Sequence, residues 1–241
     1  MRLIGVGVGP GDPELVTLKA VRLLRTADRV YVPVLAHEEP GRAEATVREH
    51  VDHERIERLV FALNERSDTA RRERYWDAAG ERVAQWLIET KGTAVFATIG
   101  DPNVYSTFSY LAETVRALVP DVAIETVPGI TAMQALAAAA GVPLVEGTEP
   151  LVLLPLARGA SSLADALAYA SDGTVVAYKG GRHLTGVAGY LKEAGRLGDA
   201  ILGSHLGLDD ERVEPLSEVD DAPYLSAVLI PARRTHRGGK L

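Results

Sequence analysis

The residues best suited to chemistry lie in one short turn, at Gly100, Asp101 and Pro102. The run before it, residues 93–99, is apolar and rich in β-branched residues, which is typical of a parallel strand buried on both faces. From Phe108 onward the apolar residues recur at intervals of three and four, as one face of a helix requires. The turn is therefore expected at the carboxyl end of a strand, where open α/β sheets bind ligands. Asp101 could point into that crevice or simply cap the turn.

Two further turns of this kind are expected. Residues 3–9 predict a strand that runs into the glycine-rich turn 9–13, and the strand 122–127 runs into the turn 128–132. In a doubly wound sheet such turns can line one crevice, at the point where the strand order reverses. They hold no Ser-His-Asp or Cys-His arrangement, no P-loop lysine and no paired carboxylates. The crevice is therefore suited to aligning two molecules for a group transfer.

The glycines of the first turn also suggest a dinucleotide site. Counted from Gly7, the pattern G-x-G-x-x-G requires glycine at position 12, where Asp12 stands; counted from Gly5, it requires glycine at position 10, where Pro10 stands. An acid facing a phosphate has the wrong charge. No acid ends the next strand, residues 30–33, to hold a ribose. The sequence therefore disfavours a Rossmann site.

Composition limits the class of protein. The 241 residues suffice for one large or two ordinary domains, and 46% hydrophobic with 24% charged residues is typical of a globular protein. The absence of cysteine excludes disulfides and thiolate nucleophiles and fits the cytoplasm. No apolar run approaches the ~20 residues that span a bilayer. The net charge of −7 argues against broad nucleic-acid binding. His50 and His53 have helical ligand spacing but no third ligand nearby, so we expect no metal site.

Alternating strands and helices predict an α/β fold of two domains. Residues 1–143 are expected to form a doubly wound, mostly parallel sheet, and residues 150–241 a smaller mixed sheet, with a polar linker at 144–150 and the active-site cleft between the domains. The acidic segment 209–223 is expected to be a loop. The second-domain elements are expected at strands 151–154, 174–178, 200–204 and 225–230 and helices 162–170 and 184–194.

Taken together, the three turns resemble the signatures of the tetrapyrrole methylases, the S-adenosylmethionine-dependent enzymes of cobalamin and sirohaem synthesis. The signatures read Gly7-x-Gly9-Pro10-Gly11-Asp12-Pro13, Gly100-Asp101-Pro102 and Pro128-Gly129-Ile130-Thr131. Their order and spacing and the two-domain length agree, so the resemblance covers nearly the whole chain.

Within this family the chain is similar to the precorrin-2 C20-methyltransferases. The similarity lies in residues 101–108, 110–111, 141–147 and 179–184. The chain departs from that branch at Ala62-Leu63-Asn64 and at Leu225, which follows Pro223-Tyr224. Pro33 stands where the uroporphyrinogen methylases end their second strand with an aspartate, which argues against the sirohaem branch.

The resemblance implies that S-adenosylmethionine binds in the cleft. It names Asp101 and Tyr105 as catalytic residues. Asp101 could offset the sulfonium charge or hold the amino-acid end, and Ser106 could equally cap a helix. The residues expected to bind the cofactor are Pro10, Gly100, Asp101, Val104, Ser106, Thr107, Thr131, Ala132, Leu154 and Lys179.

The implied substrate is a reduced tetrapyrrole, methylated at its C20 meso carbon. Because a sulfonium methyl group is already activated, transfer needs chiefly alignment and exclusion of water. The carboxylates of the substrate suit arginine forks and lysine charges. The expected substrate-binding residues are Tyr110, Arg158, Arg182, His183 and His205, although each could be a surface charge or a structural hydrogen bond.

The resemblance also implies a homodimer. The alanine-rich helix 131–140 and the apolar residues of 104–118 are expected to supply its interface. The alternatives to this function are a related methylase with another acceptor, such as ribosomal RNA or a different corrin intermediate, and a non-catalytic module that binds adenine nucleotides.

Overall fold

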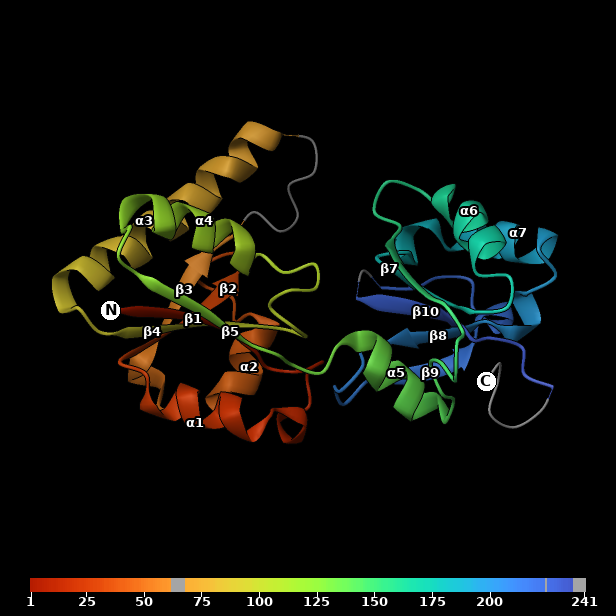
Figure 1. Cartoon of the computed structure of the whole chain (residues 1–241), viewed down its shortest axis with the longest axis horizontal. Helices are drawn as coiled ribbons and strands as arrows, with labels where there is room; N and C mark the ends of the chain where they lie inside the picture. The colour runs from red at the N-terminus through yellow and green to blue at the C-terminus, as the bar shows by residue number, and fades with distance from the viewer. Residues whose placement is uncertain (62–67, 224, 236–241) are drawn as a thin grey trace. The chain divides into compact units, whose positions relative to one another are not determined.

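The computed structural model describes residues 1–61, 68–223 and 225–235, and the chain divides into two compact units, Met1–Thr131 and Ala132–Leu241. Each unit has a five-stranded sheet covered by helices (Figure 1). Ala62-Leu63-Asn64, Tyr224 and the tail 236–241 lie outside the described residues. None of the described helices is both long and apolar enough to cross a bilayer.

The first sheet is parallel throughout, in the order β3-β2-β4-β1-β5. The central strand β1 pairs with β4 on one side and β5 on the other, so that Leu3 lies between Ala94 and Ile124. The strands are β1 (Arg2–Gly7), β2 (Arg29–Val34), β3 (Ile56–Val60), β4 (Thr93–Thr98) and β5 (Ala123–Val127).

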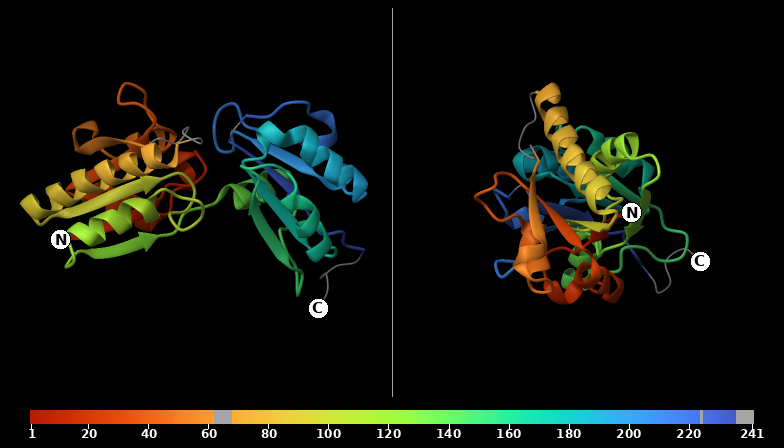
Figure 2. Two further views of the ribbon diagram at one scale, coloured as in Figure 1. Left: turned by 90° about the horizontal axis from the view of Figure 1, so that it is seen from above. Right: turned by 90° about the vertical axis from the view of Figure 1, so that its left-hand side faces the viewer.

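Helices cover both faces of this sheet (Figure 1). On one face are α1 (Leu18–Thr26) and α2 (Arg42–Arg48), and on the other are α3 (Thr69–Thr90) and α4 (Phe108–Leu118). The last two run side by side (Figure 2, left), because Gly80 lets α3 approach Thr114 of α4 closely. The chain therefore leaves β1 and its neighbour β4 toward opposite faces. Their carboxyl ends therefore form a topological switch point, where open α/β sheets bind ligands.

The second sheet is mixed, in the order β6-β7-β10-β8-β9, with β6 and β7 parallel and the other pairs antiparallel. The predicted fold class is thus confirmed. The strands are β6 (Leu151–Pro155), β7 (Thr174–Tyr178), β8 (Ile201–Ser204), β9 (Arg212–Pro215) and β10 (Ser226–Ile230).

Strand β9 corrects the prediction of a loop over 209–223. It is a short strand at the edge of the sheet and pairs only with β8, with Gly203 opposite Val213. Arg212 and Glu214 flank that valine. Charged residues are common on edge strands because they discourage pairing with other chains, and they also make such a strand look like a loop in the sequence.

The helices of the second unit are α5 (Ala132–Ala140), α6 (Ser162–Tyr169) and α7 (Leu184–Glu193). Leu136 and Ala137 of α5 are buried against Val176 and Leu229 of the second sheet. For this reason the chain divides before Ala132, whereas the sequence had placed the domain boundary at the linker near residues 144–150.

Candidate active site

The three predicted turns of the first unit meet through their backbones. The amide of Gly100 donates a 2.7 Å hydrogen bond to the carbonyl of Gly9. A Cβ atom added to Gly7 would lie 2.4 Å from the carbonyl oxygen of Gly100, and one added to Gly129 would lie 2.1 Å from the same atom. No side chain can be accommodated at such distances. The turns after β1, β4 and β5 therefore form one closely packed group, as the sequence predicted.

Asp101 connects two of these turns. Asp101 is buried, with 8% of its surface exposed, and its two carboxylate oxygens accept hydrogen bonds from two different backbone amides. Oδ1 accepts from the amide of Asn103 at 2.8 Å, within its own turn, and Oδ2 accepts from the amide of Gly129 at 3.0 Å, in the turn after β5. Both oxygens are thus engaged by the protein itself. Asp101 therefore holds the two turns in position. This role is similar to that of a turn cap, which the sequence left open as an alternative.

Gly100 faces open space. Its φ of +69° is in the left-handed region that favours glycine, and a Cβ atom added there would meet no atom within 4 Å. The backbone at the centre of the three turns is therefore accessible to a ligand. This is the feature that a cofactor cradled by backbone groups requires, so the residues present fit S-adenosylmethionine. Among the other predicted cofactor residues, Pro10 and Thr131 are buried and Val104, Thr107 and Ala132 are half-buried.

Two neighbours in the second turn have defined local roles. Ser106 accepts a hydrogen bond from the amide of Phe108, the first residue of α4, at 3.1 Å and donates to Thr98 at 3.2 Å; the N-cap position itself is taken by Thr107. Tyr105 has a φ of +50° and is 46% exposed. Partial burial raises the pKa of its phenol, which therefore stays protonated near neutral pH and can donate a hydrogen bond.

Tyr110, predicted to bind substrate, is part of an aromatic pair on the helices. Its ring stacks on that of Trp76 in α3, with centroids 4.0 Å apart and planes at 9°. The guanidinium of Arg72 lies 5.4 Å from the centre of the Trp76 ring. The sequence had not singled out Trp76 as a partner, because the contact depends on how α3 and α4 pack.

In the second unit, Lys179 follows β7 and His205 follows β8, and both have left-handed backbones, with φ of +61° and +52°. Within the described residues only four residues other than glycine have positive φ, and Tyr105 is a third. The fourth, Lys91, ends helix α3. Left-handed backbone in residues with side chains is uncommon and tends to occur at functional sites. Three of the four strained positions are thus ones that the sequence assigned to the site.

His205 has a partner that the sequence did not identify. Its Nδ1 lies 2.5 Å from Oδ2 of Asp210, across the tight turn that follows β8. An acid that holds one imidazole nitrogen fixes the orientation of the ring and leaves the other nitrogen for a further contact. By contrast, Leu154 is a buried member of the core of the second unit.

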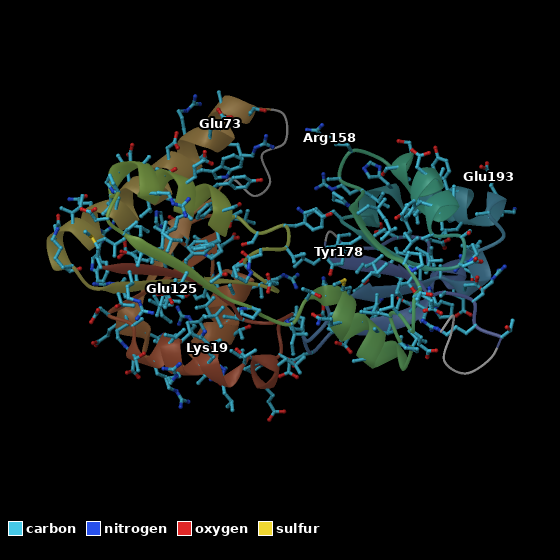
Figure 3. The ribbon with its side chains drawn as sticks, viewed as in Figure 1. Lys19, Glu73, Glu125, Arg158, Tyr178 and Glu193 are labelled. Carbon is cyan, nitrogen blue, oxygen red and sulfur yellow. The ribbon has the colours of Figure 1, made fainter. Side chains whose placement is uncertain are left out.

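The remaining candidates gather on one surface of the second unit. Arg182 and His183 line an open hollow of about 430 Å³ next to Gly159, Ala160 and Ser161. Arg158 directly precedes these residues, in the loop between β6 and α6 (Figure 3). The structure thus places two of the five predicted substrate-binding residues at this hollow, with Arg158 one residue before its lining.

His50 and His53 both have protein partners. His53 contacts Arg48, and the ring of His50 lies 3.2 Å from the carbonyl of Pro13. No group of three or more potential metal ligands gathers in the part of the chain that the structure describes.

Comparisons with known proteins agree with this geometry. A family model described as Tetrapyrrole (Corrin/Porphyrin) Methylases matches residues 2–220. The probable cobalt-precorrin-2 C(20)-methyltransferase of Methanocaldococcus jannaschii is 40% identical over 154 residues, a match that covers 64% of each protein. The precorrin-2 C(20)-methyltransferase of a Sinorhizobium species is 33% identical over 238 residues, which cover 95% of each.

Solved structures share the fold. The chain is similar to a cobalamin biosynthetic enzyme, cobalt precorrin-4 methyltransferase, with a TM-score of 0.71 and 19% identity over 95% of this chain and 94% of that one. It is also similar to the uroporphyrin-III C-methyl transferase of Thermus thermophilus complexed with S-adenyl homocysteine, with a TM-score of 0.64 and 21% identity over 95% and 97%.

Proposed function

Because the chain belongs to the tetrapyrrole (corrin/porphyrin) methylases, we propose that it transfers a methyl group from S-adenosylmethionine to the C20 meso carbon of precorrin-2 or cobalt-precorrin-2. The observation that supports the proposal is the group of three turns, packed closely through their backbones, with open space beside Gly100. The choice of acceptor is based on the two relatives described above, whose names specify precorrin-2 and its cobalt form.

Bound S-adenosylmethionine supplies an activated methyl group on a positively charged sulfur. The chain itself has to hold the two reactants in line and exclude water. Asp101 serves this end by fixing the second and third turns relative to each other. Pro10, Val104, Thr107 and Thr131 then contact the cofactor around the open face of Gly100.

The side chains of the second unit are proposed to act on the acceptor. Arg158, Arg182 and His183 are donors to carboxylates, and so is Lys179. His205, oriented by Asp210, offers its second ring nitrogen to the acceptor. The protonated phenol of Tyr105 donates a hydrogen bond to the macrocycle.

We also propose that the protein works in the cytoplasm as a homodimer, as the family resemblance implies. The exposed residues of the two predicted segments, such as Ala138 and Ala139 of α5 and Leu118 of α4, are the candidates for its interface. Leu136 and Ala137 of α5 pack on the second sheet, and Phe108 and Leu111 of α4 pack on the first. Light scattering at micromolar concentration should give about twice the chain mass of 25.7 kDa; a clean monomer mass would refute the dimer.

The activity is tested with purified protein, precorrin-2 and S-adenosylmethionine labelled with ¹³C in its methyl group. We expect one labelled methyl group per product molecule, attached at C20. Assays with metal-free and with cobalt-loaded acceptor identify the form that is used. A label at another carbon, or on ribosomal RNA, would reassign the acceptor. Binding of S-adenosylhomocysteine with no transfer to any acceptor would favour a non-catalytic module.

A further inference from the structure

The hollow that Arg182 and His183 line has an unusual chemical character for so acidic a chain. Its other polar side chains are Ser161, Thr185 and Tyr190, and no acidic residue is among the residues that line it. All of these side chains can donate a hydrogen bond, because a neutral imidazole also has one N–H group. In a chain of net charge −7, a hollow with donors and no carboxylate favours an anion.

These donors are also uncommitted. Within the described residues the structure gives no hydrogen bond or ion pair to the side chains of Arg182, His183, Ser161 or Tyr190. Arg158, one residue before the lining segment, is likewise unpaired and exposed. Two other arginines of the unit are neutralised: Arg234 lies 2.6 Å from Glu149, and Arg233 lies 2.6 Å from Asp199.

The backbone holds the two cationic candidates in place. Arg182 and His183 belong to the short helical turn Gly181–His183, directly before α7. A Cβ atom on Gly181 would lie 2.4 Å from the carbonyl oxygen of Pro223 and 2.5 Å from that of Ala222. This turn is therefore packed tightly against the chain that leads into β10, so its position is fixed before any ligand binds.

A second hollow provides a contrast. It has a volume of about 670 Å³ and lies in the first unit, around residues 48–54. Its lining combines Arg48, His50 and His53 with Glu49 and Asp52. Arg48 also pairs with the buried carboxylate of Glu44. That larger hollow has its charges balanced internally, whereas the smaller one in the second unit does not.

We propose that the hollow around Arg182 binds a carboxylate arm of the tetrapyrrole acceptor, with the guanidinium of Arg182 as the principal donor. This inference rests on the proposed function, because the carboxylates are those of the proposed substrate. A volume of about 430 Å³ is within the range of small-molecule sites and admits a side-chain carboxylate with its methylene stem.

The test compares three variants in steady-state methyl transfer to precorrin-2. Arg182→Gln removes the charge, and Gly186→Leu fills the hollow, because a Cβ atom there points at Ala160 from 3.4 Å. Lys192→Gln is the matched control, since it removes one exposed charge from the same helix, outside the lining. Melting temperatures show whether each variant is folded.

We expect Arg182→Gln to raise the KM for the tetrapyrrole about tenfold, with kcat within about twofold of wild type. Gly186→Leu should raise KM similarly, and Lys192→Gln should leave it unchanged. Affinity for S-adenosylhomocysteine should be the same in all three. A KM for Arg182→Gln equal to that of Lys192→Gln would overturn the inference.

Two further measurements separate the possible failures. If the wild-type protein methylates no tetrapyrrole, the proposed function fails. Titration with uroporphyrin, a stable polycarboxylate, then still tests the hollow. Arg182→Gln should weaken the binding of uroporphyrin, and Lys192→Gln should not. Titration with inorganic phosphate tests for a free-anion site. Phosphate binding that requires Arg182, together with an unchanged KM for the tetrapyrrole, would refute the inference.

Discussion

The candidate site of the first unit consists mainly of backbone groups, whereas that of the second unit consists of polar and charged side chains. In the first unit, Gly7 and Gly129 pack so closely against the carbonyl oxygen of Gly100 that an added Cβ atom would lie 2.4 Å or 2.1 Å from it. In the second unit, the candidates are Lys179, His205 and the uncommitted donors around Arg182. The contrast matches the two reactants, because a cofactor must be held in one conformation and a polycarboxylate needs cations. Substitutions that add atoms should therefore impair cofactor binding in the first unit, and substitutions that remove charge should impair acceptor binding in the second.

The largest effect is expected from Gly129→Ala. The new Cβ atom would lie 2.1 Å from the carbonyl oxygen of Gly100, which the hydrogen bond to Gly9 holds in place. We expect a loss of about 1–3 kcal/mol in the free energy of unfolding and at least tenfold weaker binding of S-adenosylhomocysteine. Denaturant unfolding and calorimetry measure the two quantities.

The control for this prediction is Gly189→Ala in α7, where an added Cβ atom meets nothing within 4 Å. It should be neutral or stabilise the helix by up to about 1 kcal/mol. If Gly129→Ala binds S-adenosylhomocysteine as the wild type does, close backbone packing does not define the first site.

A smaller effect is expected from Asp101→Asn. The amide retains one acceptor oxygen, so one of the two backbone hydrogens, from Asn103 or Gly129, loses its partner. We expect about 1–3 kcal/mol of destabilisation together with weaker cofactor binding. Asp121→Asn, in an exposed turn of the same unit, is the control. A variant with normal stability and affinity but low kcat would instead make Asp101 a catalytic residue.

The sequence predicted the parallel strands and their turns well, because buried apolar runs and glycine-proline turns are local signals. It could not reveal that Asp101 bonds to Gly129, since that contact joins two turns 28 residues apart through the register of the first sheet. The same limit hid Trp76 beside Tyr110, which lie on different helices. Asp210 is only five residues from His205, but their contact depends on the form of the turn after β8. Packing against the second sheet, rather than local propensity, decided to which unit α5 belongs.

The smallest effect concerns backbone strain. Lys179→Gly and Lys91→Gly both remove a side chain from a left-handed residue, with φ of +61° and +54°. Each should gain up to about 1 kcal/mol in the free energy of unfolding. Only Lys179→Gly should reduce methyl transfer, because Lys91 merely ends α3. Equal activity of the two variants would show that neither the side chain nor the strained backbone of Lys179 contributes to methyl transfer.

We propose that the three turns of the first unit bind S-adenosylmethionine through backbone groups and that the charged hollow of the second unit does not take part. This binding is measured by calorimetric titration of S-adenosylhomocysteine into the protein, without metal or nucleotide. We predict one saturable site per chain, retained in Arg182→Gln and lost or strongly weakened in Gly129→Ala. Binding that requires a divalent ion, tighter binding of NAD, or loss of binding in Arg182→Gln alone would contradict the account.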